Sequence, residues 1–384
     1  MKKIVLAIDS FKGCLSSYDV EQAAKEGVQS VLPDSDVLCV PIADGGEGML
    51  DVMVQLTQGH YVEVAVHDPL MRPIKAKYGV TGDGTTAIIE MAQASGLPLL
   101  SEYERNPMET TSYGTGELIA HALVAGYRKI LIGIGGSATN DAGMGMMQAL
   151  GTVFYDDKGQ KLSTGCGKLL PFVRSVDIQE FNRLISLCSF ATACDVDNPF
   201  CGSNGAAYVF ARQKGANSTG ISLLDEGMRS FAGMVYSITG LKLNELPGAG
   251  AAGGIGGALA AFFHSSLRPG IDLILEKVGF ESKIQGADLI ITGEGKADEQ
   301  TMMGKVPAGV LKYGLSHHIP VVLMAGTVDN SEFLLKSGFT GVYAATPSDM
   351  PLAEALRKEI AKANISRSAV QIIKESLVKG QRTI

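Results

Sequence analysis

The stretch Lys129–Gly145, with the sequence KILIGIGGSATNDAGMG, constrains the fold more than any other part of the chain. Apolar residues up to Ile134 can form a buried strand, and small and polar residues follow before an apolar helical pattern resumes. Gly133, Gly135 and Gly136 permit positive φ and close backbone approach, and a helix start presents unpaired N–H groups. The stretch predicts strand, glycine turn and helix, with a turn that either binds an anion such as phosphate or only caps the helix.

The polar side chains in this turn are Ser137, Thr139, Asn140 and Asp141. A rival hypothesis rests on the same residues, because Gly133–Ala138 fits the loose G-x-G-x-x-G/A dinucleotide pattern and Asp156 follows about 20 residues later. An NAD-dependent hydroxy-acid dehydrogenase therefore stays open at this point.

Length and composition favour a two-domain α/β protein. The chain has 384 residues, 47 glycines and no tryptophan, and its net charge is −7. No basic surface indicates nucleic acid or acidic lipid as a partner. The six cysteines are scattered without a C-x-x-C motif, which favours reduced thiols and a cytoplasmic protein.

Neither of two apolar stretches in the sequence indicates a membrane protein. Met1-Lys-Lys precedes only a short strand-like apolar run that ends at Asp9, so we expect no signal peptide. Leu246–Leu267 lacks acidic and basic residues, but glycines crowd its first half. We expect a glycine-rich loop followed by a buried helix, and no membrane association.

The two ends of the chain show a repeated pattern of strand, polar glycine turn and helix. In the first unit, Ser16 and Asp19 form a capping signal for a helix that runs to Val31. Such units build a Rossmann-like, doubly wound parallel sheet, in which ligands bind at the carboxyl ends of the strands. The expected strands are Lys3–Ile8, Val37–Ile42, Leu289–Thr292, Val321–Ala325 and Val342–Ala345.

The middle of the chain has another pattern. Alternating β segments at Tyr61–Val66, Ile74–Val80 and Thr85–Met91 predict a meander, and Ala206–Phe210 is a further expected strand. We therefore expect a discontinuous Rossmann-like domain at 1–60 and 285–384. The expected inserted α/β domain, with a mixed sheet, covers 61–284, and the active cleft lies between the two domains.

Several of the predicted turns carry charged and hydroxyl side chains beside glycine. If these turns converge, they supply lysines and backbone donors for phosphate, carboxylates for Mg²⁺, and a carboxylate near an acceptor hydroxyl, as phosphoryl transfer requires. A Walker A motif, H-E-x-x-H and G-x-S-x-G are absent from the sequence, which argues against a P-loop enzyme, a zinc hydrolase and an α/β-hydrolase. The residues are Asp9, Ser10, Lys12, Asp44, Glu47, Asp195, Asp197, Glu294, Lys296 and Asp298.

Read together, seven motifs resemble the type 1 glycerate kinase family. They are DSFKG at 9–13, PIADGGEG at 41–48, TSYGTGEL at 111–118, GIGGSATND at 133–141, CDVDNP at 194–199, PGAGAAGG at 247–254 and ITGEGK at 291–296. The resemblance implies a Rossmann-like domain with an inserted α/β domain, and an ATP- and Mg²⁺-dependent kinase for D-glycerate. Similar bacterial members form 2-phosphoglycerate in glycolate/glyoxylate or glucarate catabolism. We expect D-glycerate as the small-molecule partner and a monomer or homodimer.

The resemblance implies that these turns line the active cleft, and physical reasoning suggests a role for each. Family members usually have Gly where Ala142 stands, Arg where Lys296 stands, and Ser or Thr where Cys14 stands, and a lysine loses the bidentate anion geometry of arginine. A non-catalytic glycerate or nucleotide sensor is the remaining alternative. The expected roles are catalytic for Asp195, as general base, and Lys12; substrate-binding for Asp9, Ser10, Lys296 and Asp197; nucleotide- or phosphate-binding for Gly135, Gly136, Ser137, Thr139 and Asn140; and metal-binding for Asp44, Glu47 and Glu294.

Overall fold

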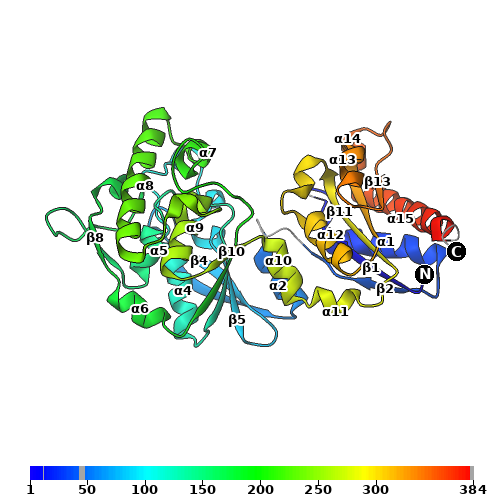
Figure 1. The fold of residues 1–384 in the computed structure, drawn as a ribbon, viewed down its shortest axis with the longest axis horizontal. Coiled ribbons are helices and arrows are strands. Elements are labelled where there is room, and N and C mark those ends of the chain that lie inside the picture. The colour runs from blue at the N-terminus through cyan, green and yellow to red at the C-terminus, as the bar shows by residue number, and fades with distance from the viewer. Residues whose placement is uncertain (12, 43–47, 381–384) are drawn as a thin grey trace. The chain divides into compact units, whose positions relative to one another are not determined.

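The computed structural model describes residues 1–11, 13–42 and 48–380 (Figure 1). The chain forms two compact units. Unit 1 comprises Met1–Asp44 and Ile271–Ile384, and unit 2 comprises Gly45–Gly270. The α/β class and the insertion of one unit into the other, predicted from the sequence, are both confirmed.

Unit 1 contains a five-stranded parallel sheet with the order β13-β12-β11-β1-β2. Numbered along the unit, this order is 2-1-3-4-5, that of a doubly wound sheet whose winding reverses between β1 and β11. The register places Ile4 opposite Leu289 on one side and Val37 on the other. The strands are β1 (Lys3–Ile8), β2 (Asp36–Cys39), β11 (Leu289–Ala297), β12 (Val321–Val328) and β13 (Gly341–Ala344).

Helices cover both faces of this sheet. Alternate residues Ile4, Leu6 and Ile8 of β1 belong to one apolar core with α1 and α15, whereas α12 packs on β11 and β12 outside that core. The Ser16 side chain accepts a hydrogen bond from the Asp19 backbone N–H and caps α1, as the sequence predicts. The helices are α1 (Ser17–Val31), α10 (Gly270–Lys277), α11 (Phe280–Ile284), α12 (Val306–Ser316), α13 (Ser331–Lys336), α14 (Leu352–Ala355) and α15 (Lys358–Gly380).

Unit 2 contains a six-stranded mixed sheet with the order β10-β9-β6-β5-β4-β3. Strands β5, β6, β9 and β10 are parallel, and β3, β4 and β5 form the antiparallel meander that the sequence predicts. Strands β7 and β8 form a separate two-stranded antiparallel sheet. The strands are β3 (His60–His67), β4 (Pro73–Val80), β5 (Thr86–Glu90), β6 (Lys129–Gly133), β7 (Val153–Tyr155), β8 (Ser175–Asp177), β9 (Ser189–Ala193) and β10 (Ser266–Arg268).

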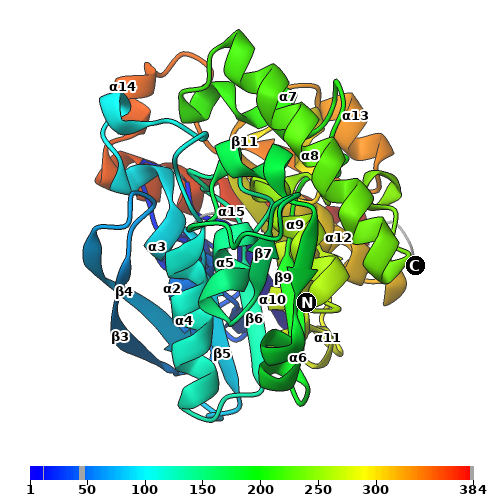
Figure 2. The same cartoon turned by 90° about the vertical axis from the view of Figure 1, so that its left-hand side faces the viewer.

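Helices also cover the sheet of unit 2, whose elements are labelled in a second view of the chain (Figure 2). A Cβ at Gly79 of β4 would clash with Leu50 and Val54 of α2. The side chain of the preceding residue, Tyr78, contacts His121 of α4. Because neighbouring strand residues point to opposite faces, α2 and α4 cover opposite faces of the sheet. The helices are α2 (Met49–Leu56), α3 (Ala92–Ser95), α4 (Tyr113–Val124), α5 (Met144–Ala149), α6 (Gln179–Ile185), α7 (Ala206–Phe210), α8 (Ser218–Thr239) and α9 (Ala251–Phe262).

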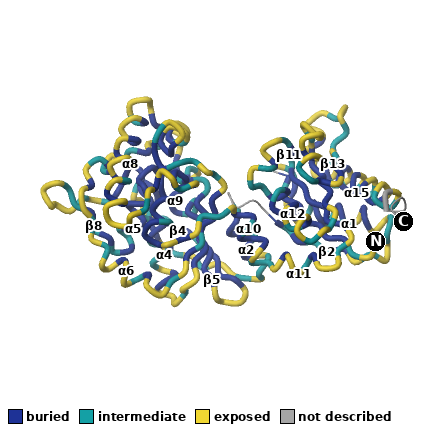
Figure 3. Tube along the Cα trace, viewed as in Figure 1, coloured by how far each residue is buried: buried dark blue, intermediate teal, exposed yellow. Residues whose placement is uncertain are grey.

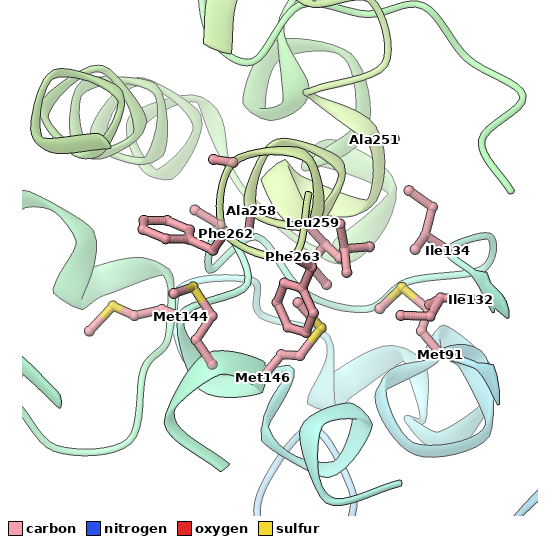
Figure 4. Close-up of a cluster of buried hydrophobic side chains, with 14 of the residues drawn as sticks. Met91, Ile132, Ile134, Met144, Met146, Ala251, Ala258, Leu259, Phe262 and Phe263 are labelled. Atoms are coloured by element: carbon pink, nitrogen blue, oxygen red, sulfur yellow. The ribbon is translucent and has the colours of Figure 1, made fainter. Parts of the chain in front are cut away.

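The core of each unit lies between its sheet and its helices, and the exposed residues lie in the turns and on the outer sides of the helices (Figure 3). In unit 2, α9 packs over the strand residue Ile132 and over Met144 and Met146 of α5 (Figure 4). The start of α9 is not regular, because Ala252, Gly253 and Gly254 have positive φ. The expected glycine-rich loop followed by a buried helix is therefore confirmed. No helix in the described ranges is long and apolar enough to cross a membrane.

The structure differs from the sequence prediction at one element. The predicted strand Ala206–Phe210 is wrong, because these residues form α7; a short apolar run does not distinguish a strand from a helix. The compact units divide at 44/45 and 270/271, and the domain boundaries that the sequence places at 60/61 and 284/285 stay a prediction. Helix α2 packs against β4 and β5 and so belongs to unit 2.

Candidate functional site

Unit 1 has a pocket of about 600 Å³ at the carboxyl ends of its strands. Asp9 and Ser10 follow β1, Glu294 and Lys296 belong to the end of β11, and Thr327 lies at the end of β12. This position, where the winding of the sheet reverses, is where doubly wound sheets bind ligands. Four predicted site residues, Asp9, Ser10, Glu294 and Lys296, are thus brought together in what we call the unit 1 pocket.

Glu294 is the buried carboxylate of the unit 1 pocket. Its Oε2 accepts a hydrogen bond from Lys305 Nζ at 3.0 Å, while its Oε1 has no partner among the described residues. A buried acceptor without a partner destabilises a fold, so such an oxygen in a pocket is suited to a ligand or a cation. Mg²⁺ is commonly held by one or two carboxylates together with substrate phosphates, and Glu294 fits that donor set.

No group of three or more His, Cys, Asp and Glu side chains is arranged to hold a metal in the described part of the chain. The predicted metal ligands Asp44 and Glu47, and the predicted catalytic Lys12, lie outside the described residues. Of the predicted metal-binding residues, the structure therefore places only Glu294.

Lys296 lies at the exposed edge of the unit 1 pocket. Its Nζ is 2.9 Å from a carboxylate oxygen of Asp329 and 3.7 Å from one of Asp298. Hydrogen bonding to Asp329 raises the pKa of Lys296, so the side chain is cationic. An anionic ligand must compete with these two carboxylates for it.

The opposite part of the unit 1 pocket is apolar. Phe11 follows β1, Leu352 and Leu356 come from α14 and its end, and Ile365 comes from α15. Asn364, also buried, adds an amide that contacts the sulfur of Met350. The pocket thus combines an apolar wall with a charged end, which suits a ligand that has a flat apolar part and an anionic part.

A second buried carboxylate, that of Glu21, lies on α1 beneath the end of β1. Its Oε1 accepts a hydrogen bond from the Ile8 backbone N–H at 3.0 Å, and its Oε2 has no partner in the described residues. Burial raises the pKa of Glu21 well above its usual range, because the backbone hydrogen bonds only partly offset the loss of hydration. The sequence offered no signal for this residue, since the helical pattern alone does not reveal a buried glutamate.

Unit 2 has its own pocket, of about 250 Å³, at the carboxyl ends of β6 and β9. Gly135, Gly136 and Ser137 follow β6, Asp195 follows β9, and Lys214 comes from the turn of 3₁₀ helix at Arg212–Lys214. Four predicted site residues meet here, and Lys214 is an addition that the sequence analysis did not single out. We call this the unit 2 pocket.

The glycine turn after β6 is fixed from both sides. The Leu97 N–H donates to the Gly136 carbonyl and the Ala138 N–H donates to the Ser95 carbonyl. Gly136 has a φ of 70°, a conformation that glycine adopts without strain. The N–H groups of Gly135 and Gly136 have no acceptor within the described ranges. The turn can therefore donate hydrogen bonds to an anion.

Thr139, Asn140 and Asp141 are fully buried and do not line the unit 2 pocket. Asp141 accepts hydrogen bonds from the Ser112 hydroxyl at 2.7 Å and from the backbone N–H groups of Ser112, Gly143 and Gly145. Its role is structural, because it joins the loop before α4 to the start of α5. Burial nevertheless raises the pKa of Asp141. A ligand contact by the side chain of Thr139 or Asn140 stays a prediction.

Ala142 is one of the positions at which the sequence departs from the motifs that it resembles. This residue, at which family members usually have Gly, is fully buried and has a φ of 52°. A Cβ makes this left-handed conformation unfavourable, so a glycine would adopt it with less strain.

Asp195 and Asp197 lie in the turn after β9, but only Asp195 lines the unit 2 pocket. Asp195 lines the unit 2 pocket, and its Oδ1 accepts a hydrogen bond from the Gly270 N–H at 2.8 Å. Asp197 is exposed and is not part of the pocket lining. The backbone of Gly270 thus orients a carboxylate beside the glycine turn.

The rival dinucleotide hypothesis does not fit this geometry. Strand β7 pairs with β8 and not with the main sheet, so the strand that should follow the glycine turn is not beside β6. The Asp156 carboxylate accepts hydrogen bonds from the N–H groups of Lys158 and Gln160 within its own turn. Asp156 is therefore a turn-forming residue.

Comparison with known proteins decides the family. A family model described as the glycerate kinase family matches residues 4–377. The chain belongs to the glycerate kinase family. Glycerate kinase of Bacillus subtilis (strain 168) is 44% identical to it over 354 residues, covering 92% of each chain. Glycerate 2-kinase of Escherichia coli (strain K12) is 42% identical over 356 residues, 92% of this chain and 93% of the relative.

A solved structure agrees with this glycerate kinase family assignment. The crystal structure of a Salmonella typhimurium LT2 protein assigned as glycerate kinase 2 matches with a TM-score of 0.87 and 42% identity, over 99% of both chains. The glycerate kinase fold predicted from the motifs is confirmed, and the chain is an enzyme with kinase activity.

The buried Glu21 predicts a pH dependence of stability. Its pKa is raised in the folded protein, so above about pH 4.5 the native state holds a proton that the unfolded chain releases, and stability falls as pH rises. Replacing Glu21 with Gln removes this loss while keeping an oxygen for the Ile8 N–H. Urea unfolding from pH 4 to pH 8 should show a Glu21→Gln variant that gains stability over wild type as pH rises.

Glu26→Gln is the matched control, since Glu26 is exposed on the same helix. A difference between Glu21→Gln and wild type that is the same at pH 4 and pH 8 would contradict the burial of an ionisable carboxyl at this position.

Proposed function

We propose that this glycerate kinase transfers the γ-phosphoryl group of ATP to the 2-hydroxyl of D-glycerate, forming 2-phosphoglycerate and ADP. The name of the E. coli relative, glycerate 2-kinase, supports the choice of hydroxyl. Kinase family membership supports ATP as the donor.

The observation that carries this proposal is that the two units present pockets of different size and chemistry at the carboxyl ends of their parallel strands. The unit 1 pocket, about 600 Å³ with an apolar wall, suits a nucleotide, and the unit 2 pocket, about 250 Å³ and lined by a glycine turn, suits a three-carbon acid. This distribution differs from the sequence prediction, which placed substrate at Asp9, Ser10 and Lys296 and nucleotide at the glycine turn.

In the unit 1 pocket, Phe11, Leu352 and Ile365 would contact the adenine ring, and Lys305 would lie near the phosphates. Mg²⁺, when bound, neutralises phosphate charge, and Glu294 would hold it through the oxygen that has no partner among the described residues. The ammonium group of Lys305 lies 3.0 Å from the other carboxylate oxygen of Glu294, so the two side chains lie side by side at the charged end of the pocket.

In the unit 2 pocket, Asp195 would act as the general base. The 2-hydroxyl oxygen of glycerate forms the new bond to the γ-phosphorus, the bond from that phosphorus to ADP breaks, and the hydroxyl proton passes to the Asp195 carboxylate. The Gly270 N–H orients this carboxylate at 2.8 Å. The N–H groups of the glycine turn are placed to receive the substrate carboxylate or the transferred phosphoryl group.

Other expectations from the sequence stay predictions. They are an active cleft between the two domains, domain boundaries near residues 60 and 285, a cytoplasmic location, a monomeric or homodimeric state, and a place in glycolate/glyoxylate or glucarate catabolism. The roles of Lys12, Asp44 and Glu47 also stay predictions.

Purified protein should release ADP from ATP only when D-glycerate is added, and EDTA should abolish this turnover until Mg²⁺ is restored. A coupled ADP-release assay measures the rate, and phosphorus NMR distinguishes 2-phosphoglycerate from 3-phosphoglycerate. Absence of glycerate-dependent ADP release would contradict the proposal, and 3-phosphoglycerate as the product would contradict the choice of hydroxyl.

Asp195→Asn should lower kcat by about 10²- to 10⁴-fold, because the amide cannot accept the proton. The Kd for D-glycerate, measured by calorimetry, should change only a few-fold, since the side-chain size and the acceptor for Gly270 are kept. Asp157→Asn, an exposed turn residue in the same unit, is the control. Unchanged kcat in Asp195→Asn would rule out this base.

A further inference from the structure

Lys214 is a buried cation that the proposed mechanism has not yet used. Only 2% of its surface is exposed, and its Nζ donates hydrogen bonds to Ser137 Oγ and to the Thr139 carbonyl, both at 2.7 Å. Both acceptors are neutral, and no described carboxylate forms an ion pair with the ammonium group. A buried ammonium with only neutral partners is unfavourable, so its position needs an explanation.

The place of Lys214 in the unit 2 pocket supplies an explanation for its burial. The residue lines the unit 2 pocket together with Gly135, Gly136 and Ser137, so its charge lies beside the turn whose N–H groups are available to an anion. An ammonium group has three N–H donors, and two of them hold the glycine turn in place. The third donor and the charge remain for a ligand.

We propose that Lys214 is the oxyanion-binding cation of the unit 2 pocket. It holds the turn at Ser137 and Thr139 with two donors and binds a negatively charged oxygen of the ligand with its charge and third donor. This inference rests on the proposed function for the identity of the ligand. The oxyanion is the carboxylate of glycerate or a phosphoryl oxygen, and binding of two separate ligands distinguishes these two sources.

The electrostatics of the free pocket agree with this role. Burial lowers the pKa of Lys214 to about 7, and the charge of the nearby Asp141 offsets this only in part. Cys194, which also lines the pocket, stays neutral because burial raises its pKa to about 11. Asp195 is the other ionisable lining group, and Arg212 lies on the same 3₁₀ turn as Lys214. At pH 8 the empty pocket therefore holds Lys214 mainly without its extra proton.

An oxyanion beside Lys214 favours the charged form, so binding at pH 8 should take up close to one proton. At pH 6 the amine already carries that proton, and uptake should be small. Glycerate is suited to this comparison, because its carboxylate is ionised at both values. Calorimetry of D-glycerate binding to wild-type protein, in two buffers with different ionisation enthalpies, measures the uptake directly and needs no variant.

Lys214→Met tests the residue itself. Methionine keeps the length of the side chain without its charge, and replacing a buried charge by an apolar group need not destabilise a protein. Losing one charge-assisted hydrogen bond to the ligand should weaken binding by about 10- to 100-fold. Lys158→Met, an exposed lysine of the same unit, is the matched control and should bind as wild type does.

Binding measurements with D-glycerate and with inorganic phosphate distinguish the two possible sources of the oxyanion. Weaker binding of D-glycerate with unchanged binding of inorganic phosphate assigns the carboxylate to Lys214, and the reverse assigns a phosphoryl oxygen. Unchanged binding of both ligands by Lys214→Met would overturn the proposal and leave Lys214 with a positioning role only. If wild type binds phosphate through Lys214 but does not turn over D-glycerate, the proposed function fails while this inference stands.

Discussion

The structure depends on one constraint that both units obey. Parallel strands buried on both faces are apolar along their length, so polar groups can enter only where a strand ends and the chain turns into a helix. In unit 1 these ends carry Asp9 and Glu294, and in unit 2 they carry Ser137 and Asp195. The carboxyl ends of parallel strands meet at one edge of a sheet, and this brings together turns that are far apart in the sequence.

Three ionisable groups in or next to these pockets are buried without full compensation. Glu21 and Glu294 each have one carboxylate oxygen without a partner among the described residues, and the ammonium group of Lys214 contacts only neutral acceptors. Each arrangement reduces the stability of the ligand-free protein. For Glu294 and Lys214 a charged ligand would supply the missing partner, so the same groups that weaken the empty protein would provide binding energy.

The sequence predicted the fold and the turns better than it predicted the role of each side chain. The seven motifs together indicated the family, and local patterns of strand, turn and helix predicted the parallel sheet of unit 1 and the mixed sheet of unit 2. Whether a polar side chain faces a pocket or the core depends on tertiary packing. Asn140 and Asp141 therefore proved buried, Ala206–Phe210 proved helical, and Lys214, 77 residues from Ser137, was not found from local sequence.

In the proposed mechanism, the nucleotide binds in the unit 1 pocket and the acid binds in the unit 2 pocket. The most direct measurement is a crystal structure of the protein with a non-hydrolysable ATP analogue and D-glycerate. Adenine should lie against Phe11 and Leu352, and glycerate should lie beside Ser137 and Lys214. Adenine on the glycine turn at Gly135 and Gly136, with glycerate at Asp9 and Ser10, would contradict it.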